Sequence, residues 1–177
     1  FIKKMIDYDM PMLKAMGVNA IRCFNDVPPR WVEYIYENYG IYTIINNLLG
    51  RYGTTVNGVW HAKTDYSDEE TRKTLIASQV ETARKYKDTN GVLMYMLGNE
   101  SNYGLEWSGS DIENLPVGER HKAKAVYLYT MFNEAIEESK KVDGERPYGI
   151  VNGDTQYIDL IAEHCPSMDV FGSNVYR

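Results

Sequence analysis

Short apolar runs alternate with longer amphipathic stretches along the chain. Runs of β-branched, aromatic and other apolar residues predict strands, and stretches with an apolar residue every three to four positions predict helices. The predicted strands cover residues 18–24, 41–45, 92–97, 146–151 and 168–171, and the predicted helices cover residues 5–16, 28–40, 67–86, 119–142 and 155–164. Strands that alternate with helices indicate βαβ units, and therefore a parallel sheet covered by helices.

Two architectures contain such a sheet. A doubly wound sheet fits the length, whereas a (β/α)₈ barrel needs roughly 250 residues, so the 177 residues would be a piece of one. Polar residues follow every predicted strand: Asn25-Asp26, Asn46-Asn47, Asn99-Glu100, Asn152 to Asp154 and Asn174 to Tyr176. Such a ring of polar loops is typical of the catalytic face of a barrel, and no glycine-rich phosphate loop marks the switch point of a doubly wound sheet. We therefore predict an α/β fold, a parallel barrel of the TIM type present as a partial barrel, with one domain over residues 1–177.

The longest connections are expected to carry function. Residues 46–66 read as a long loop with three glycines, and long ordered loops in compact domains are usually functional. After it, Ser67 with Glu70 three positions later predicts a capping box that begins the next helix. A second long loop follows Glu100.

The composition argues against several functions. The chain has 25 acidic and 19 basic residues and a formal net charge of -6, which argues against nucleic acid as a partner. No apolar run approaches the length of about 18 residues that a membrane span needs. The two cysteines and three histidines show neither a disulfide framework nor ligand spacing, so we expect no metal and no cofactor. Nothing fixes the compartment: a periplasmic or secreted location fits, and a cytoplasmic one stays open.

The sharpest chemical feature is Glu100. It follows an apolar strand directly, behind Gly98 and Asn99. A carboxyl at the edge of a buried strand is partly desolvated, which raises its pKa and suits it to donate a proton near neutral pH. Asn99 would bind a substrate hydroxyl or orient the acid. From position alone, Glu100 serves equally well as a cap or as a member of a surface ion pair.

Arg22 and the end of the last strand supply further candidates. Arg22 lies within an apolar strand, where a cation needs a carboxylate partner. It would either hold a catalytic carboxylate in the barrel mouth or form a structural ion pair with a residue such as Asp169. Asn174 and Tyr176 are expected to face the same mouth, although residues at such positions are more often ordinary loop residues.

Aromatic residues make up 12% of the chain, with 15 Tyr and 3 Trp. A pyranose ring packs its C–H face on an aromatic plane, so loop aromatics are candidate sugar platforms. Trp107 and Tyr103 lie in the loop after Glu100, and Trp60 lies in the preceding long loop. The alternative for a loop tryptophan is a lid over a small core.

Three segments together resemble a known family. They are the run from Leu13 to Arg22 with its Met16-Gly17-x-Asn19-x-x-Arg22 pattern, the strand end Leu97-Gly98-Asn99-Glu100, and residues 169–176. This combination resembles the catalytic barrel of glycoside hydrolase family 2, which includes β-galactosidases, β-glucuronidases and β-mannosidases. The resemblance covers almost the whole chain, from barrel strand 2 to barrel strand 6.

The resemblance implies a retaining β-glycosidase that hydrolyses O-glycosidic bonds of β-linked oligo- or polysaccharides. Glu100 would be the general acid/base, Asn99 would contact the sugar 2-hydroxyl, and Arg22 would support the nucleophile. The expected substrate-binding residues are Arg22, Asn99, Asp26, Trp107, Asn174 and Tyr176. Two departures stand out: the family usually has a histidine where this chain has Asn25-Asp26, and the loop over residues 51–61 has no counterpart that we can place.

A retaining glycosidase also needs a second carboxylate about 5–5.5 Å from the acid/base. In this family it comes from barrel strand 7, so we expect these residues alone to be an inactive piece of an enzyme. Glu106 and Asp154 do not match the position of the family's nucleophile. A non-catalytic carbohydrate-binding or scaffold domain, and a doubly wound module for a small metabolite, are the alternatives. The open strand edges of a partial barrel also predict that either the remaining strands of the natural protein or a second copy of the chain pairs with them, so self-association is one of the two expected outcomes.

Overall fold

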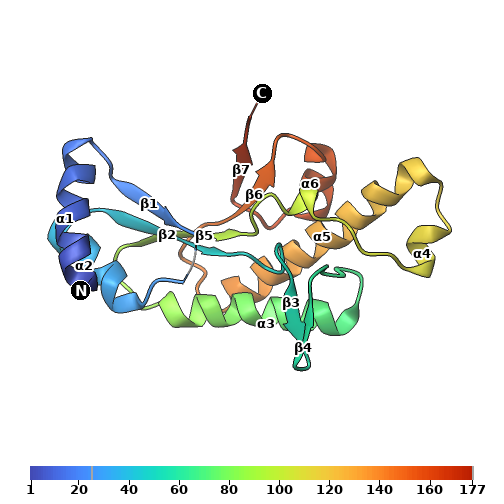
Figure 1. Ribbon diagram of the computed structural model, residues 1–177, viewed down its shortest axis with the longest axis horizontal. Coiled ribbons are helices and arrows are strands. Elements are labelled where there is room, and N and C mark those ends of the chain that lie inside the picture. The colour runs from blue at the N-terminus through green and yellow to red at the C-terminus, as the bar shows by residue number, and fades with distance from the viewer. Residues whose placement is uncertain (25, 177) are drawn as a thin grey trace.

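A five-stranded parallel sheet forms the centre of the computed structural model, which describes residues 1–24 and 26–176 (Figure 1). Its order is β1 (Ala20–Cys23), β2 (Tyr42–Asn47), β5 (Val92–Leu97), β6 (Tyr148–Gly153) and β7 (Val170–Asn174). Each parallel strand joins the sheet beside the preceding one, so the order never reverses. A doubly wound sheet reverses at its switch point, and that alternative is therefore wrong. The strands curl into a half-barrel, which confirms the predicted partial barrel.

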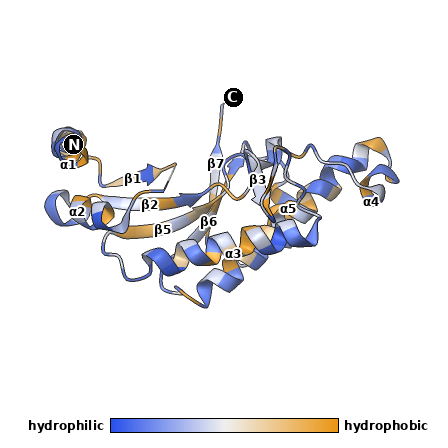
Figure 2. Ribbon diagram, turned by 60° about the horizontal axis from the view of Figure 1, so that its bottom comes forward, coloured by the Kyte–Doolittle hydropathy of each residue, from blue (hydrophilic) through white to orange (hydrophobic). Residues whose placement is uncertain are grey.

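One helix precedes the first strand of this sheet, the others separate its consecutive strands, and together they cover its outer face. They are α1 (Ile2–Ala15), α2 (Pro29–Tyr39), α3 (Glu69–Tyr86), α5 (Val117–Lys140) and α6 (Ile158–His164). In Figure 2, α3 runs along the lower side of the sheet. The main core lies between sheet and helices, where Leu75 of α3, Phe132 of α5 and Tyr95 of β5 are fully buried. No helix within the described part of the chain is both long and apolar enough to cross a membrane.

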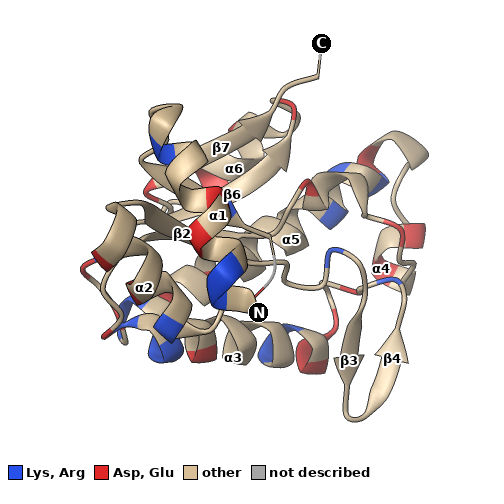
Figure 3. Ribbon diagram, turned by 60° about the vertical axis from the view of Figure 1, so that its left-hand side comes forward, with Lys and Arg blue, Asp and Glu red and all other residues tan. Residues whose placement is uncertain are grey.

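Charged side chains lie mostly on the helices. Both signs appear on α1, α2 and α3 in Figure 3, and many of them form pairs along one helix, such as Lys73 with Glu69 at 2.8 Å. Such exposed pairs contribute little to stability. They keep the outer surface solvated and mark no single-sign face.

The local structure differs from the sequence prediction in three places. The loop predicted over residues 46–66 contains an antiparallel hairpin of β3 (Thr54–Val56) and β4 (Val59–His61). The N-cap of α3 is Asp68 rather than Ser67, because the Asp68 carboxylate accepts from the Thr71 N–H at 2.8 Å. The loop after Glu100 contains a short 3₁₀ helix, η1 (Ser101–Tyr103), and a short helix, α4 (Ser110–Glu113).

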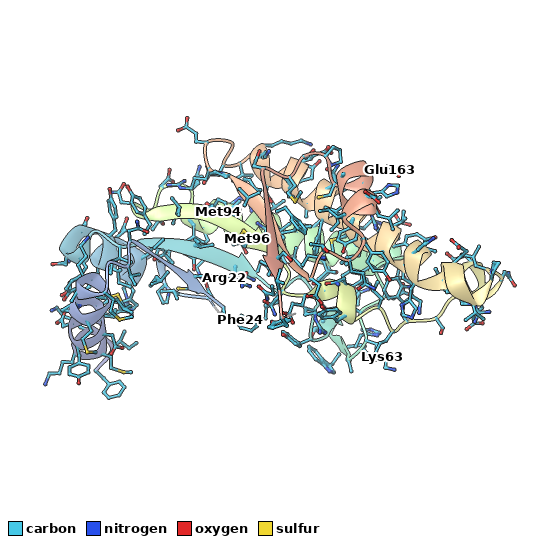
Figure 4. The ribbon with its side chains drawn as sticks, turned by 90° about the horizontal axis from the view of Figure 1, so that it is seen from above. Arg22, Phe24, Lys63, Met94, Met96 and Glu163 are labelled. Carbon is cyan, nitrogen blue, oxygen red and sulfur yellow. The ribbon has the colours of Figure 1, made fainter. Side chains whose placement is uncertain are left out.

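The inner face of the half-barrel is filled by long side chains. Arg22 on β1 and Met94 on β5 both align with Ile44 of β2 between them, and Met96 lies one layer further along β5 (Figure 4). A Cβ at Gly149 of β6 would lie only 2.6 Å from the Met96 sulfur. Glycine on the neighbouring strand therefore leaves the space that Met96 fills, as expected for a packed barrel interior.

Candidate active site

Glu100 stands at the carboxyl end of β5, on a turn with left-handed backbone conformations. Gly98 has φ 70° and Glu100 has φ 54°, and the Glu100 N–H donates to the carbonyl of Val151 at 2.8 Å. A Cβ at position 98 would lie 2.7 Å from Ser101 Oγ and 2.8 Å from the Phe132 ring, so this turn needs glycine there. A positive φ in a glutamate costs energy, and such strain clusters at functional sites.

The end of β7 binds the Glu100 carboxylate. Asn174 Nδ2 donates to Glu100 Oε1 at 2.8 Å, and the Tyr176 hydroxyl donates to the same oxygen. The hydrogen bond from Tyr176, then that from Asn174, and also the positive charge of Arg51 hold the pKa of Glu100 below its usual value, against a smaller opposing effect of burial. The expectation that the pKa of Glu100 is raised is therefore wrong: burial does raise it, but the two hydrogen bonds outweigh that effect. The expectation that all three residues share one mouth is met by these contacts.

Arg22 reaches the same site from β1. Its Nη2 donates to Asn99 Oδ1 at 2.9 Å and its Nε donates to Asn46 Oδ1 at 2.8 Å. Asn46 in turn donates to the carbonyl of Gly98 at 3.0 Å. Burial lowers the pKa of Arg22, and the negative charge of Glu100 acts against that shift. Arg22 therefore fixes both amides at the turn that carries Glu100.

Asp169 is not the partner of Arg22. It pairs with Lys140 at 2.8 Å and accepts from the Tyr148 N–H at 2.8 Å. The alternative of a structural ion pair between Arg22 and Asp169 is therefore wrong.

Sequence reasoning did not assign Arg51 and Tyr52, which join this cluster from the loop after β2. Arg51 Nε donates to the carbonyl of Asn99 at 3.1 Å, and its guanidinium lies 4.9 Å from the centre of the Tyr52 ring. Asn99 Nδ2 donates to the Tyr52 hydroxyl at 3.3 Å. The two glycines on either side of this pair, Gly50 and Gly53, were the available signal, since they indicate an irregular turn rather than a flexible loop.

Trp107 is not a sugar platform. It is 5% exposed and packs edge to face against Tyr66 with ring centroids 5.5 Å apart. The ammonium group of Lys124 lies 5.5 Å from the centre of the Trp107 ring. Burial leaves no ring face for a sugar, so the alternative of a core lid is the correct one.

Asp26 is bound by the end of α3. Its carboxylate accepts from the Tyr86 hydroxyl at 2.5 Å and forms an ion pair with Lys85, both at the end of α3. These contacts explain why a carboxylate so close to Arg22 in sequence does not pair with it. Asn25, its predicted neighbour in the site, lies outside the described residues.

Two other predicted aromatic platforms remain accessible. Tyr103 is 44% exposed, its hydroxyl donates to Asp154 Oδ2 at 2.6 Å, and its ring lies where a Cβ at Gly153 would be. Trp60 on β4 is 61% exposed. In the part of the chain that the structure describes, no group of three or more His, Cys, Asp or Glu is placed to hold a metal ion.

The strand order defines a parallel (β/α) half-barrel, with Glu100 on a strained turn at the carboxyl end of its central strand. The family model for "Glycosyl hydrolases family 2, TIM barrel domain" matches residues 1–176. The chain therefore belongs to glycoside hydrolase family 2. No curated protein sequence matches it.

Solved glycosidase structures share this fold. β-Glucuronidase 2 from Bacteroides uniformis is 13% identical with a TM-score of 0.67, over 98% of this chain and 18% of its own. β-Galactosidase from Bacillus circulans is 14% identical with a TM-score of 0.66, over 99% of this chain and 38% of its own. β-Galactosidase from the haloarchaeon Halorubrum lacusprofundi is 8% identical with a TM-score of 0.69, over 98% of this chain and 38% of its own. The chain thus spans between 18% and 38% of these proteins, and the likeness concerns the fold alone.

Proposed function

We propose that the chain carries the acid/base half of the active site of a retaining β-glycosidase, with Glu100 as the proton-transfer residue. The observation that supports this best is the convergence of three strand ends on the turn that carries Glu100 at the end of a fourth strand. Asn174 of β7 binds Glu100 directly, while Arg22 of β1 and Asn46 of β2 hold the preceding turn. A barrel that only binds sugar does not need one glutamate in a strained conformation that is held by hydrogen bonds from three sides.

In this mechanism, Glu100 acts twice. A second carboxylate attacks the anomeric carbon, the glycosidic C–O bond breaks, and the proton of Glu100 passes to the leaving oxygen. The Glu100 carboxylate then takes a proton from water, whose oxygen attacks the anomeric carbon and releases the second carboxylate. By the resemblance, we expect that second carboxylate on barrel strand 7, outside the 177 residues, and we expect these residues alone to be inactive.

The contacts of Glu100 fit its second role better than its first. Tyr176 and Asn174 favour the ionised form, which is the form that accepts a proton from water. A second carboxylate at about 5–5.5 Å would oppose them, because a like charge nearby raises a pKa. The neutral acid needed for the first step then becomes accessible near neutral pH.

The test uses the natural gene product and the aryl β-glycoside it turns over fastest in a panel of galactoside, glucuronide and mannoside. Glu100→Ala should lower kcat/KM about 1000-fold for a substrate with a poor leaving group. A 2,4-dinitrophenyl glycoside, whose leaving group needs no proton, should lose far less in the first step. Added azide should then restore turnover and give a glycosyl azide of retained β configuration, because azide attacks the glycosyl-enzyme without base catalysis.

Glu163→Gln is the matched control, because Glu163 is an exposed carboxylate on α6, 71% accessible, and it should leave both substrates unaffected. Equal losses on good and poor leaving groups, or an azide product of inverted configuration, would rule out Glu100 as the acid/base.

A further inference from the structure

The loop between β2 and β3 supplies two side chains that the proposed mechanism leaves without a role. We propose that Tyr52 is a substrate-binding residue: its hydroxyl and the Asn99 amide donate to one sugar hydroxyl, that on the carbon next to the anomeric centre, and Arg51 positions Tyr52. This inference rests on the proposed function, because it completes the contact with the sugar 2-hydroxyl that the family resemblance implies for Asn99.

The hydrogen bonds fix the orientation of the Asn99 amide. A guanidinium only donates, so the Asn99 oxygen must face Arg22, and its nitrogen must face the Tyr52 hydroxyl. The bond between Asn99 and Tyr52 uses one of the two amide N–H groups. In the same bond the Tyr52 oxygen is the acceptor, so the hydroxyl proton of Tyr52 is not used and can be donated to a ligand.

Both remaining donors lack an acceptor within residues 1–24 and 26–176. The Tyr52 hydroxyl has no partner there besides Asn99, and Asn99 Nδ2 has none besides Tyr52. Their heavy atoms are 3.3 Å apart, so one oxygen atom can accept from both. Asn99 is only 8% exposed but Tyr52 is 53% exposed, so the pair is open to solvent on the side of the tyrosine. A sugar hydroxyl that replaces water there can accept from both donors.

The environment of this donor pair suits a pyranose. Tyr52 is 53% exposed and its ring centre lies 6.2 Å from that of Phe24, which is itself 44% exposed. The two rings thus form an accessible apolar wall beside the amide and hydroxyl donors, and Asn99 is the residue directly before Glu100. A sugar bound here would have its C–H face near the rings and its hydroxyl at their base.

The turn that carries Tyr52 is rigid. Leu49, Gly50 and Gly53 have φ 44°, 76° and 102°. The Leu49 side chain is buried, its carbonyl accepts from the Tyr66 hydroxyl at 3.0 Å, and the Gly50 carbonyl accepts from Thr64 Oγ1 at 2.6 Å. A left-handed leucine held in this way is a strained and well-supported conformation. The turn therefore presents Arg51 and Tyr52 at a fixed place.

Arg51 connects the two donors of the pair. Its Nε binds the Asn99 carbonyl, while its guanidinium face lies over the Tyr52 ring. The first contact holds the backbone that carries Asn99, and the second holds the phenol by a cation–π interaction. A lysine keeps the charge but has neither the planar face nor the Nε donor.

The experiment compares Tyr52→Phe with the wild-type natural gene product on a matched pair of 2,4-dinitrophenyl β-glycosides, the parent sugar and its 2-deoxy analogue. Loss of one hydrogen bond to the substrate should lower kcat/KM on the parent sugar roughly tenfold. On the 2-deoxy sugar, the variant and the wild type should agree within about twofold, because the hydroxyl that Tyr52 binds is absent. Arg51→Lys should show the same preference for the parent sugar with a smaller loss.

Two reference variants separate the outcomes. Tyr42→Phe removes a phenol hydroxyl at the other end of β2, where it contacts only Tyr36 at 3.2 Å among the described residues, and it should change neither substrate. Asn99→Ala should lose activity on the parent sugar and little on the 2-deoxy sugar.

Equal losses for Tyr52→Phe on both sugars, or no loss on either, would overturn the role of Tyr52. Equal losses for Asn99→Ala would instead contradict the Asn99 role on which the inference rests, and retained azide rescue of Glu100→Ala would still leave the acid/base assignment standing.

Discussion

Two arginines at opposite ends of the sheet, Arg22 and Arg146, show how the same side chain serves different purposes. Arg146, before β6, donates to the Asp143 carboxylate at 2.6 Å and to the carbonyls of Lys87 and Thr89 at 2.7 and 3.1 Å. Among the residues that the structure describes, Arg22 near the end of β1 donates only to two neutral side-chain amides.

The difference lies in compensation of charge. Asp143 is buried, and it also accepts from the Tyr95 hydroxyl at 2.7 Å, so the charge of Arg146 is balanced and its donors are occupied. Within the described residues, Arg22 forms no ion pair, and only two of the roughly five N–H groups of a guanidinium are used. Arg22 is an exposed residue of β1, so solvent and the nearby negative charge of Glu100, rather than a paired carboxylate, balance its charge. The amino ends of the strands, the bottom of the barrel, therefore carry residues that stabilise the fold. The carboxyl ends, its top, carry the residues that we propose for chemistry.

The largest effect is expected at the bottom. Asp143→Ala leaves the Arg146 charge buried without its partner, which should lower the free energy of unfolding by about 3–5 kcal/mol. A urea titration of the natural gene product measures this. The kcat/KM of the protein that remains folded should change less than about twofold, since no contact of Asp143 reaches the catalytic end. A marked loss of activity without loss of stability would contradict the assignment of Asp143 and Arg146 to the stability of the fold.

At the top, the expected effect on activity is nearly as large and the effect on stability is small. Arg22→Gln should lower kcat/KM about 100-fold, because Asn99 and the turn before Glu100 lose the donor that places them. Stability should change by less than about 1 kcal/mol, because Arg22 is exposed and its loss breaks no ion pair among the described residues. Arg22→Lys is the matched variant and should be nearly as inactive, since lysine lacks the planar, forked set of N–H donors of a guanidinium. Severe unfolding of both variants would show that Arg22 is structural, like Arg146.

The sequence predicts the strands better than the connections between them. The bounds of β5 were predicted without error, because Gly91 and Gly98 flank an uninterrupted apolar run. The β3–β4 hairpin was overlooked, although Asn57-Gly58 between two short β-rich segments is a hairpin signal. Both residues have positive φ, 50° and 79°. Strands of three residues each are too short for a periodic pattern to show.

The site could be predicted only as far as strand order determines it. Parallel strands end at one edge, which is why Glu100, Arg22 and Asn174 could be expected together. The burial of Trp107 depends on Tyr66, a residue from another loop. The lowered pKa of Glu100 depends on donors 74 and 76 positions away in the chain. The place of Tyr52 depends on a strained turn, whose φ values no composition reveals.

The smallest expected effect sharpens the picture of Glu100 itself. Tyr176→Phe removes the hydrogen bond that contributes most to the lowered pKa of Glu100. That bond favours the ionised carboxylate, so its loss makes protonation easier and raises the pKa, while Asn174, Arg51 and the opposing charge of Asp154 remain. If Glu100 must be protonated for the first step, the alkaline limb of the pH profile of kcat/KM should move to higher pH. Tyr42→Phe should leave the profile in place. A limb that stays fixed in Tyr176→Phe, or that moves to lower pH, would mean that another group sets the alkaline limit and that the top of the barrel does not use Glu100 as its acid.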